Sequence, residues 1–309
     1  MFHIYSPHVK SKLYHILIFR ENHTDLCLLI LLIFCYNCSM TKKMIAIDLD
    51  GTLLKSDGTI SNYTVAVIKK IQEQGHLVII STGRPYRMAL EYYKILGLKT
   101  PMINFNGSLT HIPEQKWAGE HRVKIERKYL FDVLKNEKAF EADFIASEYR
   151  KKFYLTFNHR QAIKPEIFGV KKLTDKMQLK PEKITRDPHA LLMQTRAADK
   201  YALADDMLKH FNHEMEISSW GGPMNILEFS PKGVNKAYAL KHLLKTLSLS
   251  KEDLIAFGDE HNDTQMLEFA SVGYAMKNAN QILLPYADKM TQFDNDHDGV
   301  AKELEKLLL

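Results

Sequence analysis

Asp48 directly follows an apolar run over residues 44–47, and Asp50 stands two residues further on. A charge at the end of a buried strand is unfavourable without a partner, and a divalent cation is the natural partner of closely spaced carboxylates. Asp259 supplies a third carboxylate after a second apolar run, over residues 254–257. Isolated close aspartates usually mark a turn or a helix cap. Their place after buried strands instead predicts a cation site made of oxygen ligands.

The elements that must position these aspartates alternate between short apolar runs and amphipathic segments. Each run stops at polar or glycine residues, and the runs cover residues 44–47, 77–80, 102–105, 254–257 and 272–276. Apolar periodicity and capping residues predict helices at 62–74, between Pro85 and Gly97, and at 236–247. This alternation predicts an α/β fold with a doubly wound parallel sheet. Such sheets bind ligands outside the carboxyl ends of their strands, where the polar residues lie.

The middle of the chain, residues 121–222, has a different pattern. It is rich in charge, and its strands are short and alternating, as at 152–157. We expect a second, α+β domain here, inserted into a core formed by residues 40–120 and 223–309. Residues 220–223 place two glycines beside a proline, which suits a hinge or an ordinary loop.

The leader, residues 1–39, does not share the pattern of the rest. It holds all three cysteines and the one long apolar run, over residues 26–36, which is too short to span a membrane. We expect that translation starts at Met40, and a signal or anchor segment is the alternative. The body without cysteine suits a reducing compartment, so we expect a cytoplasmic protein unless residues 26–36 are a genuine signal or anchor.

The composition is that of a globular protein. The chain has 309 residues, of which 45% are hydrophobic and 26% charged, so a disordered or fibrous protein is excluded. The net charge of +5 is small and no run of five like charges occurs. We therefore expect no nucleic-acid partner.

Four motifs resemble, in order, those of haloacid dehalogenase superfamily phosphatases of the Cof-type sugar-phosphatase branch. They are DLDGT at 48–52, STGRP at 81–85, PKGVNK at 231–236 and GDEHND at 258–263. The resemblance covers residues 40–309. It implies a Rossmann-like core with residues 121–222 as a large α/β cap, which closes over the site and selects the substrate.

The resemblance also implies the chemistry of these motifs. Asp48 would be the nucleophile that forms an aspartyl-phosphate, and Asp50 would be the general acid and then the general base. Mg²⁺ would bind Asp48, the backbone carbonyl of Asp50 and Asp259. Lys236 would balance the charge on Asp48 and the phosphoryl group. Asp263 would have a supporting role, orienting Lys236 or a metal-bound water.

By the same resemblance, Thr82 belongs to the catalytic set, and five residues would contact the phosphate. They are Leu49, Thr82, Gly83, Lys236 and Asn262. Lys232 is a rival for the role of Lys236, and Arg84 would either reach the substrate or form a structural ion pair. His261 lies among the metal-site residues, but Mg²⁺ prefers oxygen ligands. Asn106 and Gly107 resemble a family turn that faces the site.

These observations predict a Mg²⁺-dependent phosphatase that hydrolyses small phosphate monoesters, such as sugar phosphates or related metabolites. A phosphomutase of the same superfamily is the nearest alternative. A regulator that binds a phosphorylated ligand without turnover is a second alternative, although Asp50, Lys236 and Asp259 are all present. The expected partner is a small phosphorylated metabolite, with no stable membrane partner. The oligomeric state stays open.

Overall fold

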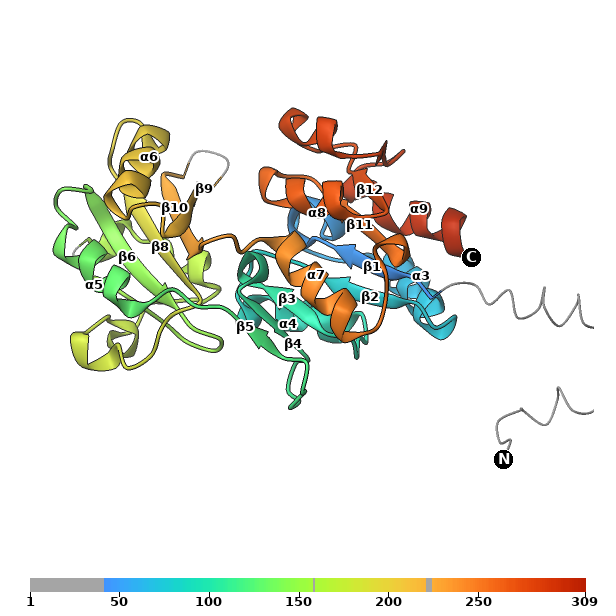
Figure 1. Cartoon of the computed structure of the whole chain (residues 1–309), viewed down its shortest axis with the longest axis horizontal. Coiled ribbons are helices and arrows are strands. Elements are labelled where there is room, and N and C mark those ends of the chain that lie inside the picture. The colour runs from blue at the N-terminus through green and yellow to red at the C-terminus, as the bar shows by residue number, and fades with distance from the viewer. Residues whose placement is uncertain (1–41, 158, 221–223) are drawn as a thin grey trace, which may run out of the picture. The chain divides into compact units, whose positions relative to one another are not determined.

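The computed structural model describes residues 42–157, 159–220 and 224–309. Its parallel sheet has the strand order β13-β12-β11-β1-β2 (Figure 1). The strands are β1 (Met44–Ile47), β2 (Leu77–Ile80), β11 (Leu254–Gly258), β12 (Val272–Ala275) and β13 (Lys289–Met290). All pairings in this sheet are parallel, and β1 lies between β2 and β11. The predicted doubly wound α/β core is therefore confirmed.

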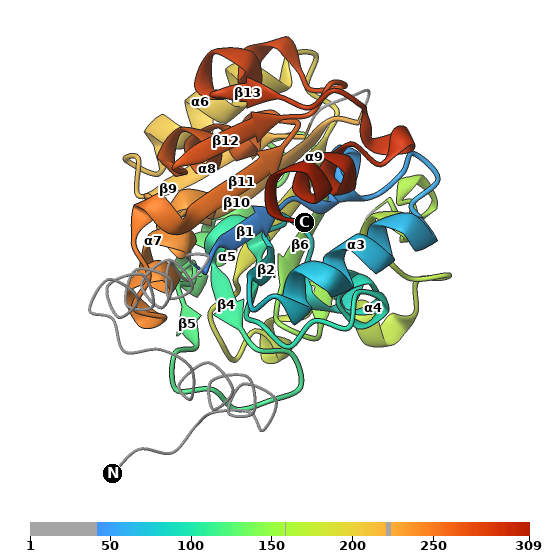
Figure 2. The same ribbon diagram turned by 90° about the vertical axis from the view of Figure 1, so that its right-hand side faces the viewer.

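Helices cover both faces of this sheet, as Figure 2 shows. One face packs against α3 (Asn62–Glu73), α4 (Tyr86–Ile95) and α9 (Gly299–Leu308). The other face packs against α7 (Lys236–Thr246) and α8 (Thr264–Phe269). The strands of a sheet covered on both faces must be apolar throughout, which explains why β1 and β2 read as continuous apolar runs.

The run at 102–105 forms a strand, but its sheet differs from the expected one. β3 (Met102–Asn104) pairs antiparallel with β4 (Leu109–His111), which pairs with β5 (His121–Arg122). A single parallel bridge from Ser81 to Ile103 connects this small sheet to the end of β2. Three-residue strands with a tight turn at 105–107 favour a local antiparallel partner. The polar end of β3 still lies beside the end of β2.

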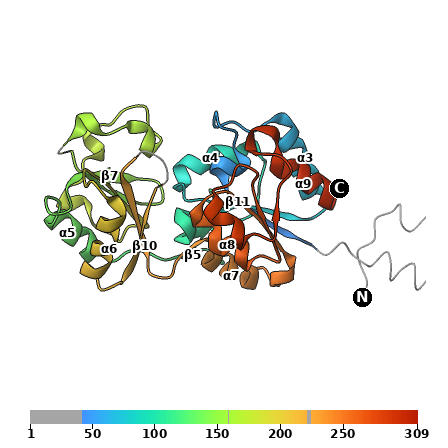
Figure 3. The same ribbon diagram turned by 90° about the horizontal axis from the view of Figure 1, so that it is seen from above.

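A second five-stranded sheet, with the order β7-β6-β8-β10-β9, is antiparallel throughout. Its strands are β6 (Ala142–Glu148), β7 (Phe153–Leu155), β8 (Ala190–Thr195), β9 (Met215–Ser219) and β10 (Ile226–Pro231). One face packs against α5 (Arg127–Lys135) and α6 (Lys200–His210). The other face packs against short 3₁₀ turns within residues 160–177. Figure 3 shows these two layers on opposite sides of the sheet.

The limits of the second domain can be compared with this sheet. β10 belongs to the antiparallel sheet and ends at Pro231, beyond the expected boundary at residue 222. By the same criterion β5 belongs with β3 and β4, so we propose that the inserted domain runs over residues 123–231. The leader at 1–39 and most of the candidate hinge at 220–223 lie outside the described residues. Among the described residues, no helix is both long enough and apolar enough to cross a membrane.

Candidate active site

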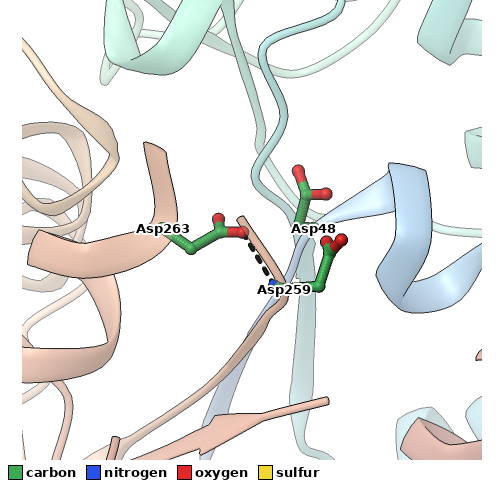
Figure 4. Close-up of side chains that lie close together, drawn as sticks. All are labelled: Asp48, Asp259 and Asp263. Carbon is green, nitrogen blue, oxygen red and sulfur yellow. Dashed lines mark hydrogen bonds between the residues drawn. The ribbon is translucent and has the colours of Figure 1, made fainter. Parts of the chain in front are cut away.

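The carboxyl ends of β1 and β11 bring Asp48 and Asp259 together. The register pairs Ile47 with Phe257, and the Asp48 amide donates to the Phe257 carbonyl at 3.1 Å. The two aspartates therefore leave neighbouring strands at almost the same level. Figure 4 shows their carboxyl groups side by side, with Asp263 reaching toward them from a neighbouring segment. Oxygen atoms of these three aspartates all lie within 4.8 Å of one another.

Lys236 is fully buried between two of these carboxylates. Its Nζ donates to Asp48 Oδ1 at 2.5 Å and to Asp263 Oδ1 at 2.6 Å. Lys236 is the first residue of α7, where the side chain of Asn235 caps the helix by accepting from the Tyr238 amide. Burial alone would lower the pKa of Lys236, but the charges of Asp263 and Asp48 outweigh it, so the pKa is raised. Lys236 is therefore a fixed cation beside Asp48.

Asp263 is held on all sides by the protein. Its Oδ2 accepts from the amides of Asp259 at 3.0 Å and Glu260 at 3.3 Å, while its Oδ1 binds Lys236. The close approach requires a glycine at position 258, because a Cβ there would lie 2.5 Å from Asp263. Asp263 thus contacts both Lys236 and the loop that carries Asp259.

Asp259 occupies the space above a glycine turn. Gly51 has a φ of +69°, and a Cβ at this position would collide with the Asp259 carboxylate. Thr52 Oγ1 donates to Asp259 Oδ1 at 2.8 Å. Burial raises the pKa of Asp259 to about 7, and burial also raises the pKa of Asp48, against the attraction of Lys236. The positive charge beside these two carboxylates therefore does not offset the cost of burying them.

This deficit fits a divalent metal. Within the described residues, Asp48 and Asp259 each keep one carboxylate oxygen that accepts no hydrogen bond from the protein. Both oxygens of Asp263 are already engaged, and those of Asp50 bind Arg84. The available donors are all oxygen atoms, which suit a hard cation such as Mg²⁺. Asp48 and Asp259 are the side chains that would hold it.

The second motif lies beside this cluster. Thr82 is buried, and its Oγ1 accepts from the Arg84 amide at 3.0 Å, which leaves the hydroxyl hydrogen free to donate. Arg84 forms an ion pair with Asp50, the second of the two possibilities that the sequence left open. Leu49 has a fully buried side chain, so a contact with the substrate would have to come from its backbone.

The rivals considered from the sequence lie apart from this arrangement. Lys232 is exposed, and its Nζ lies 3.6 Å from Glu214. Lys236 is therefore the lysine that contacts Asp48. His261 is exposed at the rim of the cavity described next and is not among the three clustered acidic residues.

A cavity of about 1060 Å³ opens at these strand ends, and Asp48, Asp50, Thr82, Gly83 and Asn262 all line it. Asn106, Trp220 and Glu228 are among the residues outside the predicted site set that also line it. Asn262 Nδ2 donates to Asn106 Oδ1 at 3.0 Å. The sequence placed Asn106 in a turn expected to face the site, but gave it no role there. A signal for Glu228 was available, since a lone acid inside the apolar run of β10 requires a partner.

Residues 45–304 match the family of haloacid dehalogenase-like hydrolases. The chain belongs to this family. The predicted resemblance is thereby confirmed.

Curated relatives and a solved structure agree with this membership. The chain is 31% identical to a Bacillus subtilis protein named 5-amino-6-(5-phospho-D-ribitylamino)uracil phosphatase YitU, over 85% of this chain and 96% of that protein. A second B. subtilis protein with the same activity in its name, YcsE, is 31% identical over 86% of this chain and 96% of its own length. A haloacid dehalogenase-like hydrolase from Bacteroides thetaiotaomicron has the same fold, with a TM-score of 0.75, 24% identity and coverage of 87% and 100%. The chain is thus a phosphatase of this superfamily.

Proposed function

We propose that this chain is a Mg²⁺-dependent phosphatase that hydrolyses small phosphate monoesters through an aspartyl-phosphate on Asp48. The observation that carries the proposal is the position of Asp48. It lines the cavity, has Lys236 at 2.5 Å, and shares its cluster with Asp259. A carboxylate held beside a fixed cation at the wall of the cavity is suited to attack phosphorus.

The first step forms a bond from the Asp48 oxygen to phosphorus and breaks the bond to the leaving oxygen. Asp50 must first separate from Arg84 and take up a proton from solvent, and it then gives this proton to the leaving oxygen. The Lys236 charge and the donors of Thr82 and Gly83 stabilise the negative charge of the transferring group. A divalent cation held by Asp48 and Asp259 would supply further positive charge for the transferring group.

The second step returns the enzyme to its starting state. Asp50, now a carboxylate, accepts a proton from water, and the water oxygen attacks phosphorus. The bond between phosphorus and Asp48 breaks, and inorganic phosphate leaves. Two carboxyl groups with different surroundings suit this exchange, since Asp48 is buried beside Lys236 whereas Asp50 is largely exposed.

Our first candidate substrate is 5-amino-6-(5-phospho-D-ribitylamino)uracil, because two relatives at 31% identity are named as phosphatases of this compound. The cavity of about 1060 Å³ is large enough for a heterocycle with a sugar-alcohol chain. Its walls include Trp220, Tyr201 and Phe105 for an aromatic ring and Glu228 and Ser218 for hydroxyl groups. Simple sugar phosphates are the competing substrates.

The test is phosphate release from a panel of this compound, sugar phosphates and nucleotides, with Mg²⁺ and with EDTA. We expect metal-dependent release, with the ribitylaminouracil phosphate ranked first. Release without metal would contradict the metal proposal. An isomerised phosphorylated product in place of free phosphate would instead identify a phosphomutase. Binding without either product would identify a regulator.

A further inference from the structure

A chain of hydrogen bonds connects Asn262 in the core to the antiparallel sheet. Asn262 Nδ2 donates to Asn106 Oδ1 at 3.0 Å, and Asn106 Nδ2 donates to Glu228 Oε1 at 3.2 Å. At the far end, Trp220 Nε1 donates to Glu228 Oε2 at 2.9 Å. All four residues line the cavity that contains Asp48. A side chain of β10 is thereby connected to the residue expected to contact the phosphate.

The direction of this chain is fixed by its end at Glu228. Burial raises the pKa of Glu228, but both of its oxygens lie as acceptors, Oε2 for the Trp220 indole N–H and Oε1 for Asn106, so Asn106 turns its NH₂ group toward Glu228. The side-chain oxygen of Asn106 then faces Asn262, so Asn262 must donate a hydrogen bond to it from its own NH₂ group. Asn262 donates one N–H to Asn106, and its second N–H can donate to an anion. The opposite orientation would present the amide oxygen of Asn262, which would repel phosphate.

Asn106 lies against the predicted phosphate loop. The backbone N–H of Asn106 donates to the Thr82 carbonyl at 3.2 Å. A Cβ added at Gly83 would lie 3.2 Å from both terminal atoms of the Asn106 side chain. Asn106 itself has a φ of 50° and a ψ of 29°, a left-handed conformation that asparagine tolerates. The Asn106 amide is therefore held between Gly83, Asn262 and Glu228.

We infer that Glu228 is a positioning residue for phosphate binding, which orients the amides of Asn106 and Asn262 so that Asn262 presents N–H groups to the phosphate. Glu228 does not touch the phosphate in this arrangement. The inference rests on the proposed function and adds a residue of the inserted domain to the phosphate site. It also gives a reason for a buried acid in an apolar strand.

The test compares Glu228→Gln with Glu148→Gln in the full chain with Mg²⁺. Glutamine can turn either end toward Asn106, so the polarity of the chain is no longer fixed. We expect the inhibition constant of inorganic phosphate and the KM to rise roughly tenfold in Glu228→Gln, the effect of one hydrogen bond to a charged group. We expect kcat to change by less than about threefold, because the chemical groups are untouched.

Glu148 is a matched control because it is the other buried acid of this sheet at the cavity. It accepts from Arg87 at 2.6 and 2.8 Å and has no bond to Asn106. We expect Glu148→Gln to keep the phosphate inhibition constant within about twofold of the wild type. An equal rise in both variants would mean that any loss of a buried acid disturbs the site, which would overturn the inference.

A double-mutant cycle with Asn106→Gly tests the pathway, since glycine accepts the left-handed backbone. We expect the double variant Glu228→Gln/Asn106→Gly to bind phosphate as weakly as Asn106→Gly alone, because Glu228 acts through Asn106. Additive losses, or unchanged phosphate binding in Asn106→Gly, would overturn the inference. If Glu228→Gln does not fold, unchanged phosphate binding in Asn106→Gly still overturns the inference.

The wild type separates the two proposals. If it binds inorganic phosphate and releases phosphate from a substrate while Glu228→Gln behaves identically, only the positioning role fails. If the wild type neither binds phosphate nor hydrolyses any phosphate monoester, the proposed function fails and the positioning role falls with it.

Discussion

Arg84 holds both side-chain oxygens of Asp50, with Nε donating to Oδ2 at 2.7 Å and Nη2 donating to Oδ1 at 2.5 Å. A carboxylate bound in this way has no proton to give. Before Asp50 acts as an acid, Arg84 must therefore leave it, either displaced by the substrate or turned toward it, and Asp50 must take up a proton from solvent. The two roles considered for Arg84 from the sequence are thus two positions of one side chain in our proposed mechanism.

Replacing Asp50 by asparagine should separate the two chemical steps. With a sugar phosphate, whose leaving group needs a proton, we expect turnover to fall by roughly 10²–10⁴-fold. With p-nitrophenyl phosphate, the leaving group needs no acid, so a burst of p-nitrophenol should precede a slow steady state in which the aspartyl-phosphate accumulates. Stopped-flow absorbance measures the burst. Equal losses in both phases for both substrates would contradict the acid and base roles.

Replacing Lys236 by methionine should destabilise the core, because Asp48 and Asp263 are then buried without their cation. We expect the free energy of unfolding to fall by about 3–5 kcal/mol. Urea denaturation at neutral pH measures the change. Lys232→Met is the matched control, since its exposed pair with Glu214 at 3.6 Å should contribute only about 0–1 kcal/mol. Similar losses in the two variants would argue against a special role for the buried pair.

Two glycines with left-handed backbones allow steric crowding to be separated from backbone strain. Gly51 has a φ of +69° and lies against Asp259, whereas Gly58 has a φ of +79° with only the Tyr92 hydroxyl near, at 3.9 Å from an added Cβ. Either alanine variant should lose roughly 1–2 kcal/mol of stability from its backbone. Only Gly51→Ala should also lose metal affinity and turnover, because its Cβ displaces the Asp259 carboxylate. Calorimetric metal titrations of both variants check this.

Metal binding should depend on pH through Asp259. Burial raises its pKa from 3.8 to about 7, so between these values the folded, metal-free protein holds a proton that the unfolded chain has released. The stability of the metal-free protein therefore falls as the pH rises from about 4 to 7. A cation needs the deprotonated form, so its affinity should rise over the same range and its binding should release protons.

Calorimetric Mg²⁺ titrations of chelator-treated protein at pH 6 and pH 8, in buffers of different ionisation enthalpy, measure both effects. Asp259→Asn should bind the metal weakly at both values. An affinity that is independent of pH in the wild type would show that Asp259 is already ionised at pH 6.

The sequence predicts the part of this site that lies on regular elements. Asp48, Thr82 and Asp259 follow strands, and Lys236 begins a helix, so apolar periodicity and capping residues place them at the ends of elements, while the roles of Thr82 and Lys236 were implied by the resemblance of the motifs. The core strands could be predicted for the same physical reason, because burial on both faces requires continuous apolar runs. The sheet partner of β3 was not predictable in this way, because a three-residue strand carries no signal that distinguishes a parallel from an antiparallel neighbour.

Contacts between distant segments were the other part that the sequence could not supply. Asn106 and Glu228 are 122 positions apart and meet only through the packing of β10 near the end of β3. The pairing of Arg84 with Asp50 was one of two open possibilities, because a flexible side chain at a strand end can reach several partners. Local pattern identifies residue types suited to chemistry, while tertiary packing decides which of them touch.

The position of β10 has a consequence for recombination between homologues. This strand lies between β8 and β9 in its sheet, and residues 232–235 alone separate it from Lys236. A chimaera that exchanges residues 121–222 would combine a foreign β8 and β9 with the native β10, and would replace Trp220 but not Glu228. A crossover after Pro231 would transfer all five strands together and leave Lys236 with its own aspartates. We therefore expect a chimaera to acquire the substrate preference of the donor only when the exchanged segment includes β10, which ends a few residues before Lys236.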